Sequence, residues 1–476
     1  MDLFTKKPVS KLLAESEDKE HGLKRSLTAT SLVALGIGAI IGAGIFTLTG
    51  VAAATHAGPA LVYSFILAAI GCAFAGFCYS EFSTMIPIAG SAYTYAYATM
   101  GELLAWIIGW ALVLEYAVGA ATVAVSWSAT IASILADFGI VIPHGLLASP
   151  FDPMPGSVNL MAVVIVVGIS SILIIGVQES ARFNAFIVFI KVTVVVLFII
   201  VGYFYINKAN YTPFVPPNTT GKFGVFGWTG VLAAAGQIFF AYIGFDAVST
   251  AAQEARNPKR DMPIGIIGSL AICTILYILY AQVLTGVVNY KDLNVAAPLA
   301  VAVDRMRDLP WLGKLMKIGS LLGLTSVILV MLLGQSRVFF SMSRDGLLPR
   351  VFSDIHPRFR TPWRSNLLLM LFVSLGAAFT PIAQLGNLTS IGTLFAFVLV
   401  CVGVIIMRRT DPDLPRPFRT PLVPLVPILG VLVNFLLMLG LGGITWGAFL
   451  TWMIIGLIVY FSYSRFHSHL LGQART

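Results

Sequence analysis

The segment GIGAIIGAGIF, residues 36–46, sets the pattern for the whole chain. It lies inside residues 26–80, a run without Asp, Glu, Lys or Arg. Since each membrane crossing needs about 20 apolar residues, this run holds two crossings, with a turn at Gly58-Pro59. Four of the segment's residues are glycines, and each weakens a helix by about 1 kcal/mol relative to Ala. The first crossing is therefore expected to be interrupted.

Eight further runs of low charge follow along the chain. Six of them hold one crossing each: Leu103–Ala136, interrupted only by Glu115; Pro153–Gln178; Phe183–Asn207, interrupted only by Lys191; Phe223–Phe245; Met262–Tyr290; and Ile318–Ser336. Two longer runs, Ser365–Met407 and Thr420–Ser464, hold two crossings each. Only 11% of the residues are charged, against about a quarter in soluble proteins. The sequence predicts an all-α membrane protein with twelve transmembrane helices.

The basic residues indicate the orientation. If the amino terminus is cytoplasmic, 22 of the 30 Lys and Arg fall in cytoplasmic segments, seven in outer loops, and Lys191 inside a span. This excess is the usual bias of inner-membrane proteins, so both termini of a twelve-span chain are expected in the cytoplasm and the protein in the cell inner (plasma) membrane. The net charge of +9 is spread over loops, which argues against a nucleic-acid partner.

Other classes of function find no support in the residues. All four cysteines fall within spans, so no disulfide framework is expected. Neither a His or Cys cluster nor a nucleophile motif is present, so we expect no enzyme, no metal and no organic cofactor. The lipid bilayer is an obligatory partner; the sequence does not specify an oligomeric state, and a monomer would suffice.

The sixth span repeats the weakness of the first, with Gly236 and Gly244 on either side of Phe239–Tyr242. The two spans run in opposite senses, and broken helices at equivalent places in two opposed halves indicate an inverted-repeat transporter with its site at the breaks. The glycines would equally allow close helix packing. The predicted division is a cytoplasmic tail 1–27, a first repeat 28–207, a second repeat 223–407, two further helices within 420–464 and a cytoplasmic tail 465–476.

Broken helices also supply polar backbone groups. Amide N–H groups of Gly42, Ala43 and Gly44, after the break, would suit a carboxylate. Carbonyl groups near Ile40 and Ile41, before the break, would suit an ammonium group. Together they would hold the zwitterionic head of an amino acid.

Three ionisable residues lie within spans, where such residues tend to face cavities or partners. Glu115 falls near the midplane and is a candidate for holding a cationic substrate or a proton, or for a structural role. Lys191 lies about 13 Å beyond Arg182, so its amine could exchange a proton during transport or pin span five to span one. Asp246 follows the second break and suits gating or packing as well as substrate contact.

These residues belong to longer motifs that resemble the amino acid–polyamine–organocation superfamily, and within it the cationic amino acid transporter branch. The motifs are GIGAIIGAGIF at 36–46, PIAGSAYTYAY at 87–97, FFAYIGFDAVSTAAQEARNPKRDMP at 239–263, GQSRVFFSMSRDGLLP at 334–349 and RPFRTPLVPLVP at 416–427. The resemblance implies a five-plus-five inverted repeat with discontinuous helices 1 and 6, a core bundle of spans 1, 2, 6 and 7, and two additional carboxyl-terminal helices.

The resemblance also implies roles for particular residues. The substrate site would comprise Ile40, Gly42, Ala43 and Gly44, with Phe240, Ala241 and Ile243 opposite and with Phe240 as an aromatic gate. Ser326 and Val330 would line the side-chain pocket. Lys191 matches a lysine that, in proton-coupled relatives, stands where sodium-coupled members bind their ion.

The resulting hypothesis is a proton-coupled importer of amino acids that works by alternating access, with basic amino acids slightly favoured because Glu115 could meet a cationic side chain. A proton-coupled carrier of small neutral amino acids such as alanine remains open, as does an exchanger without net uptake. Vertebrate members of the branch carry two further spans, so their uncoupled transport is not assumed for a twelve-span chain.

The predicted topology is directly testable. A reporter enzyme that is active only in the cytoplasm, fused after Thr476, should be active in cells. A reporter at the same position that is active only in the periplasm should be silent, and its activity would refute the arrangement.

Overall fold

The computed structural model describes residues 4–8, 27–87, 91–176, 181–295, 297–306 and 310–470. Helices account for nearly all of the ordered elements, with one isolated bridge pairing Leu27 and Ala255. The expectation of an all-α protein is confirmed.

The helices of the first part of the chain are α2 (Ala29–Ile40), α3 (Thr49–Ala52), α4 (Leu61–Met85), α5 (Ser91–Thr99), α6 (Glu102–Val113), α7 (Gly119–Asp137), α8 (Leu160–Ile175) and α9 (Ala181–Tyr203). Those of the middle part are α10 (Gly227–Ile238), α11 (Ala247–Thr250), α12 (Pro258–Val287), α13 (Pro298–Arg305) and α14 (Pro310–Arg344). The last are α15 (Trp363–Phe379), α16 (Ile382–Thr410), α17 (Leu425–Gly440), α18 (Gly442–Val459) and α19 (Arg465–His467).

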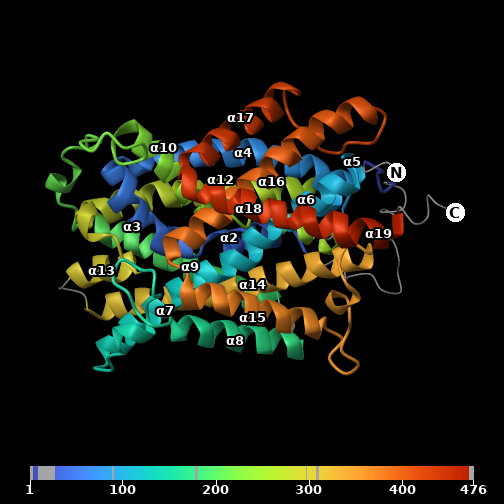
Figure 1. Cartoon of the computed structure of the whole chain (residues 1–476). Helices are drawn as coiled ribbons and strands as arrows, with labels where there is room; N and C mark the ends of the chain where they lie inside the picture. Colours follow the sequence, from blue (N-terminus) through green and yellow to red (C-terminus); the bar gives the residue numbers. More distant parts are fainter. Residues whose placement is uncertain are drawn as a thin grey trace.

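Length and composition make this a multi-pass membrane protein. Within the described residues, eight helical segments are long and apolar enough to cross a bilayer, and four shorter apolar helices, α2, α8, α15 and α17, accompany them. Large apolar side chains such as Ile275 and Ile458 are about 61% exposed on the outer surface, as hydrocarbon requires. In Figure 1 the helices run side by side along one direction, and α19 lies at the end that carries α5.

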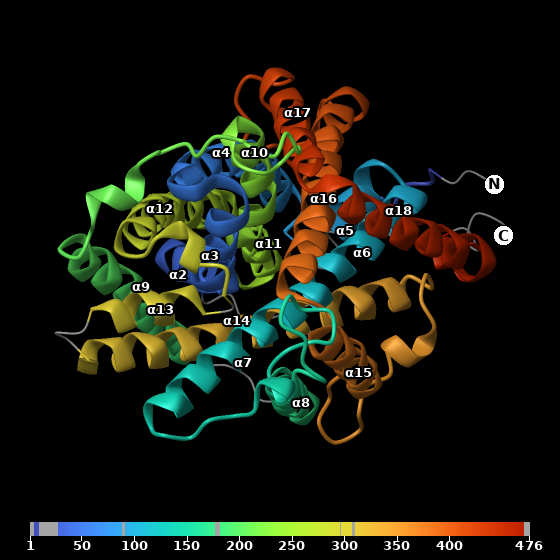
Figure 2. The same cartoon turned by 60° about the vertical axis from the view of Figure 1, so that its left-hand side comes forward.

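The long helices form two packed groups. In one, α12 packs against α2 and α4, and α10 packs against α4. In the other, α14 packs against α7, and α15 against α8. Figure 2 shows α2, α4 and α12 on one side and α7, α8, α14 and α15 on another. Helix α9 contacts members of both groups, α12 and α14, so it lies where they meet.

A buried ionic cluster closes the end of α4. Both carboxylate oxygens of Glu81 accept hydrogen bonds from Arg408, at 2.8 and 2.9 Å, and the amide of Thr420 donates to one of them at 2.8 Å. The Nε atom of Arg416 lies 3.3 Å from the other oxygen. Glu81 is only 2% exposed, so its charge depends on these partners. The cluster fastens α4 to the end of α16 and to the segment that precedes α17.

The first described residues, which belong to the predicted tail 1–27, dock against the helices. The amide of Lys7 donates to the carbonyl of Tyr97 at 3.0 Å, and the amide of Glu102 donates to the carbonyl of Thr5 at 3.1 Å. Lys7 also pairs with Asp345 at 3.2 Å. Burial raises the pKa of Tyr97, so its hydroxyl stays protonated and donates to Glu102 at 2.9 Å. Residues 9–26 of the predicted tail lie outside the described residues.

Lys317, one of the seven Lys and Arg that the predicted topology places in outer loops, lies within α14 and is 2% exposed. Its amine pairs with Asp137, at the end of α7, at 3.0 Å and with Asp304, in α13, at 2.9 Å. Two carboxylates offset the cost of burying this amine.

The Glu81 cluster should contribute strongly to stability. In Arg408→Met the buried carboxylate loses its bidentate partner, which typically costs about 3–5 kcal/mol, so the melting temperature in detergent should fall clearly. The matched control is Arg364→Met, which removes an exposed pair with Asp354 worth about 1 kcal/mol or less. Equal melting temperatures for the two variants would contradict the assignment.

Candidate functional site

Helix α2, which belongs to the group with α4 and α12, is interrupted, as the glycines of its segment predict. Helix α2 ends at Ile40, Ile41 takes extended dihedral angles (φ −73°, ψ 105°), and a π-helical segment begins at Gly44. A Cβ atom on Gly44 would lie 2.2 Å from the Cα atom of Ala241, so only glycine allows this approach. A Cβ atom on Gly42 would lie 3.1 Å from a methyl group of Val327.

The second interruption faces the first. A 3₁₀ turn, Phe239–Tyr242, follows α10, and Ile243 is extended (φ −59°, ψ 134°). Gly244 has φ +118°, a conformation that favours glycine, and a Cβ atom there would lie 2.7 Å from the backbone of Ala39. The two breaks therefore touch through their backbones, and the residues that were predicted at 40–44 and at 240–243 come together.

Two side chains bind the carbonyl end of α2. The Lys191 amine donates to the carbonyl oxygen of Gly38 at 2.5 Å, and the Tyr277 hydroxyl donates to that of Ile40 at 3.0 Å. Lys191 is fully buried, and its alkyl stem packs against Gly323 of α14. The carbonyl of Ile40, which the sequence suggested for a substrate ammonium group, is thus already engaged by a tyrosine that sequence reasoning did not single out.

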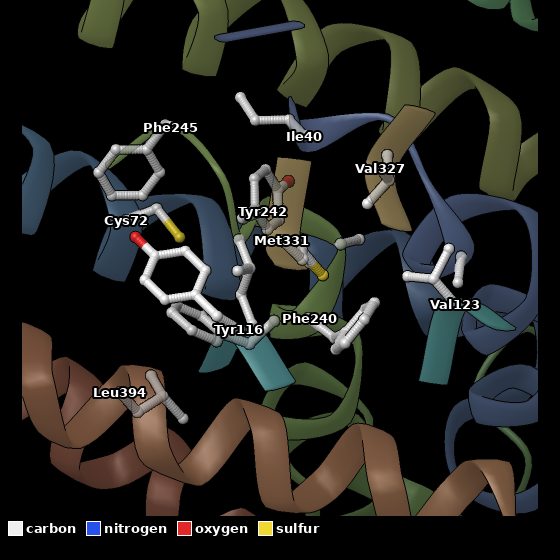
Figure 3. Close-up of a cluster of buried hydrophobic side chains, with 14 of the residues drawn as sticks. Ile40, Cys72, Tyr116, Val123, Phe240, Tyr242, Phe245, Val327, Met331 and Leu394 are labelled. Atoms are coloured by element: carbon white, nitrogen blue, oxygen red, sulfur yellow. The ribbon is translucent and has the colours of Figure 1, made fainter. Parts of the chain in front are cut away.

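Around the two breaks the lining is apolar. Figure 3 shows Ile40, Phe240, Val327 and Met331 gathered there, with Val123 beside them. Each of these side chains is at most 5% exposed, so the protein is closed over the site. Residues 42–44 are buried as well.

The residues predicted for the side-chain pocket lie one position away from this lining. The hydroxyl of Ser326 donates to the carbonyl of Gly323, within its own helix, at 3.1 Å, and Val330 is half-buried. Their neighbours Val327 and Met331 are also one helical turn apart. A Cβ atom on Gly42 would meet Val327, and one on Gly119 would meet Met331. Helical register of this kind could not be read from one sequence, since every nearby residue of α14 is apolar or small.

Glu115 and Asp246 form a separate feature. Glu115 lies on the π-helical segment Leu114–Val118 between α6 and α7, and Asp246 immediately precedes α11. Both are fully buried, and their carboxyl groups are close neighbours. The hydroxyl of Tyr116 donates to Asp246 at 3.1 Å.

Potential metal ligands do not cluster in the described residues. In the part of the chain that the structure describes, no three His, Cys, Asp or Glu side chains come together as a metal would require. An apolar groove of about 430 Å³ between α4 and α12 is lined by exposed side chains such as Ile70 and Ile275, so it belongs to the outer surface.

The contact between the two breaks should be essential. Gly44→Ala places a methyl group against the backbone of Ala241, so one of the two breaks must shift. Substrate binding by the purified protein should therefore be lost. Gly447→Ala, on a lipid-facing helix with no atom within 4 Å of the added carbon, is the control and should bind normally. Normal binding by the Gly44 variant would show that the contact is dispensable.

Comparison with known proteins agrees with this architecture. A model of the family described as "Amino acid permease" matches residues 27–462. The methylthioribose transporter of Bacillus subtilis is 46% identical over 98% of this chain and 99% of its own length. The branched-chain amino acid permease BcaP of the same organism is 45% identical over 98% and 99%. The vacuolar cationic amino acid transporter 4 of Arabidopsis thaliana is 37% identical over 86% of this chain and 68% of its own length.

A match over this much of the chain, together with two facing broken helices in an all-helical membrane protein, shows the family. The chain belongs to the amino acid permease family of the amino acid–polyamine–organocation superfamily; it is a membrane permease for amino acids or related solutes, not an enzyme.

Proposed function

We propose that this permease imports amino acids by alternating access and couples their entry to protons through Lys191. The observation that carries the proposal is the buried Lys191 amine, which donates to the carbonyl of Gly38 just before the break in α2. An amine at that position can fasten the broken helix when it is charged and loosen it when it is neutral.

The coupling follows from the energy of that contact. A charge-assisted hydrogen bond contributes about 1.5–3 kcal/mol, which is lost when the amine releases its proton. A change of that size shifts an equilibrium between two conformations by about tenfold or more. Because α9 contacts both helix groups, loosening its hold on α2 would let the groups move apart. Proton release from Lys191 would in this way favour the conformation that releases substrate.

The substrate head group would bind at the breaks. Amides at 42–44, at the start of the helical segment after the first break, suit a carboxylate, and carbonyls near 41 suit an ammonium group. The apolar lining by Phe240, Val327 and Met331 favours neutral amino acids with small or aliphatic side chains. The similarity to a branched-chain amino acid permease supports the same class.

Basic amino acids are the second candidate. Glu115 is a buried acid next to Tyr116 in the chain, and cationic amino acid transporters are among the relatives. The methylthioribose transporter adds a third chemistry, so the substrate screen should include methylthioribose.

The wider arrangement forms part of the proposal. Spans one to five, within 28–207, and six to ten, within 223–407, would be inverted repeats, with two more helices in 420–464. Residues 1–27 and 465–476 would be cytoplasmic tails of a twelve-span protein in the plasma membrane. Phe240 and Asp246 would act as gates on opposite sides of the site.

Lys191→Ala should abolish coupling. In vesicles that contain the purified variant, a proton gradient should no longer drive accumulation of substrate, whereas some substrate binding should remain because the breaks persist. The control is Lys314→Ala, which removes an exposed lysine lying over Phe138 and should accumulate substrate like the unaltered protein.

Two results would count against this role. Accumulation by the Lys191 variant on a proton gradient alone would remove the lysine from coupling. Uptake that requires substrate preloaded on the far side, in the unaltered protein, would indicate an exchanger.

Glu115→Gln separates the two substrate classes. If the permease carries neutral amino acids, the ratio of its affinities for leucine and arginine should change little in this variant, since the apolar lining is untouched. If Glu115 contacts a cationic side chain, loss of its charge should weaken arginine binding by more than about tenfold relative to leucine. Dissociation constants of leucine and arginine, measured on the variant and on the unaltered protein, decide between the two substrate classes.

A further inference from the structure

Glu115 and Asp246 form a buried acidic pair that the proposed coupling through Lys191 does not involve. The two residues come from different helix groups, since Glu115 belongs to the α6–α7 helix, which packs against α14, and Asp246 to the break before α11, which packs against α2 and α12. Neither residue is exposed at all.

Cations do not balance this pair. Among the described residues, no Lys, Arg or His forms an ion pair with either carboxyl group. Asp246 accepts hydrogen bonds from Tyr116, at 3.1 Å, and from the amide of Gly244, at 3.3 Å. Neither carboxyl oxygen of Glu115 accepts a hydrogen bond from a donor group in the part of the chain that the structure describes.

Other buried acids of the chain are treated differently. Glu81 has two arginine partners, as described above. Glu102 accepts hydrogen bonds from the hydroxyls of Tyr97, Tyr460 and Ser468. An ionised carboxylate is stabilised in both surroundings, and Glu115 has neither.

The surroundings of the pair are polar but not basic. The groups that face it are the thiol of Cys72 and the hydroxyls of Tyr79, Tyr95, Tyr116, Ser249 and Thr393. The hydroxyls of Tyr79, Tyr95 and Ser249 also make no hydrogen bond. Two buried acids with unsatisfied polar atoms on and around them, those of Glu115, Tyr79, Tyr95 and Ser249, indicate that the acids share a small positive ligand.

We propose that Glu115 and Asp246 together bind one proton, at a site distinct from Lys191. Two neighbouring carboxylates in a water-poor interior repel each other too strongly for both to be ionised, and a single bound proton removes that repulsion. The pair then carries one charge, which the Tyr116 hydroxyl and the Gly244 amide stabilise on Asp246, leaving the proton on Glu115.

The proton would take part in transport because the pair bridges the two groups. This step rests on the proposed alternating access. When the groups separate, the carboxyls part and meet water, and the O–H bond of Glu115 breaks with transfer of the proton to a water molecule. When they close, one proton is taken up again. The pair would thus lose and regain one proton in each cycle, in addition to the proton exchange at Lys191 on which coupled accumulation depends.

Infrared spectroscopy of the full-length protein in lipid tests the site directly. At neutral pH the unaltered protein should show the carbonyl band of a protonated carboxylic acid, with the usual small shift in heavy water. Glu115→Gln and Asp246→Asn should each remove this band. Glu81→Gln, the matched buried acid with arginine partners, should leave the band in place.

Lys191→Ala should also retain the band, and this separates the present inference from the coupling role of the lysine. Absence of the band from the unaltered protein at neutral pH would overturn the proposal, whether or not any variant folds. Retention of the band in both the Glu115 and Asp246 variants would do so too. A band that vanishes when sodium replaces choline in the buffer would assign the pair to a metal cation instead.

Discussion

The structure depends on which groups donate hydrogen bonds to the carbonyl oxygens at the broken end of α2. In hydrocarbon no water is at hand for an exposed carbonyl, so a helix can stop within the membrane only where protein groups replace its missing partners. Here the Lys191 amine and the Tyr277 hydroxyl supply hydrogen bonds to Gly38 and Ile40. A charged lysine is tolerated at this depth because its amine donates a hydrogen bond to a carbonyl oxygen of the broken helix. The buried amine therefore depends on the helix break, and the break is stabilised by the amine and by Tyr277.

The position of everything else around the site follows from close backbone contact. Gly44 lies against Ala241 and Gly244 against Ala39, so the two breaks are pressed together and neither could carry a larger residue without separating from the other. Apolar side chains of α14 close the site from the side of the second helix group. Movement between the groups would change this contact, the lysine contact and the Glu115–Asp246 pair at once.

Much of this arrangement could be predicted, for identifiable reasons. Charge-free runs located the helices, the glycines of 36–46 located the first break, and the depth of Lys191 placed it beside α2. The parts that escaped prediction depend on side-chain register and on long-range partners. Val327 and Met331 lie beside the residues chosen from the sequence, because α14 offers small or apolar residues on all sides. The ion pairs of Glu81 could not be predicted, since its arginine partners come more than three hundred residues later in the chain.

The central claim is that a proton gradient alone drives substrate into a vesicle through this protein. It is tested by measuring uptake of radiolabelled leucine into liposomes that contain the purified, unaltered protein and no internal substrate, with an inwardly directed proton gradient. The account predicts accumulation above the external concentration, and its collapse on addition of a protonophore. Accumulation that is equal with and without the gradient, or uptake that never exceeds equilibrium, would contradict it.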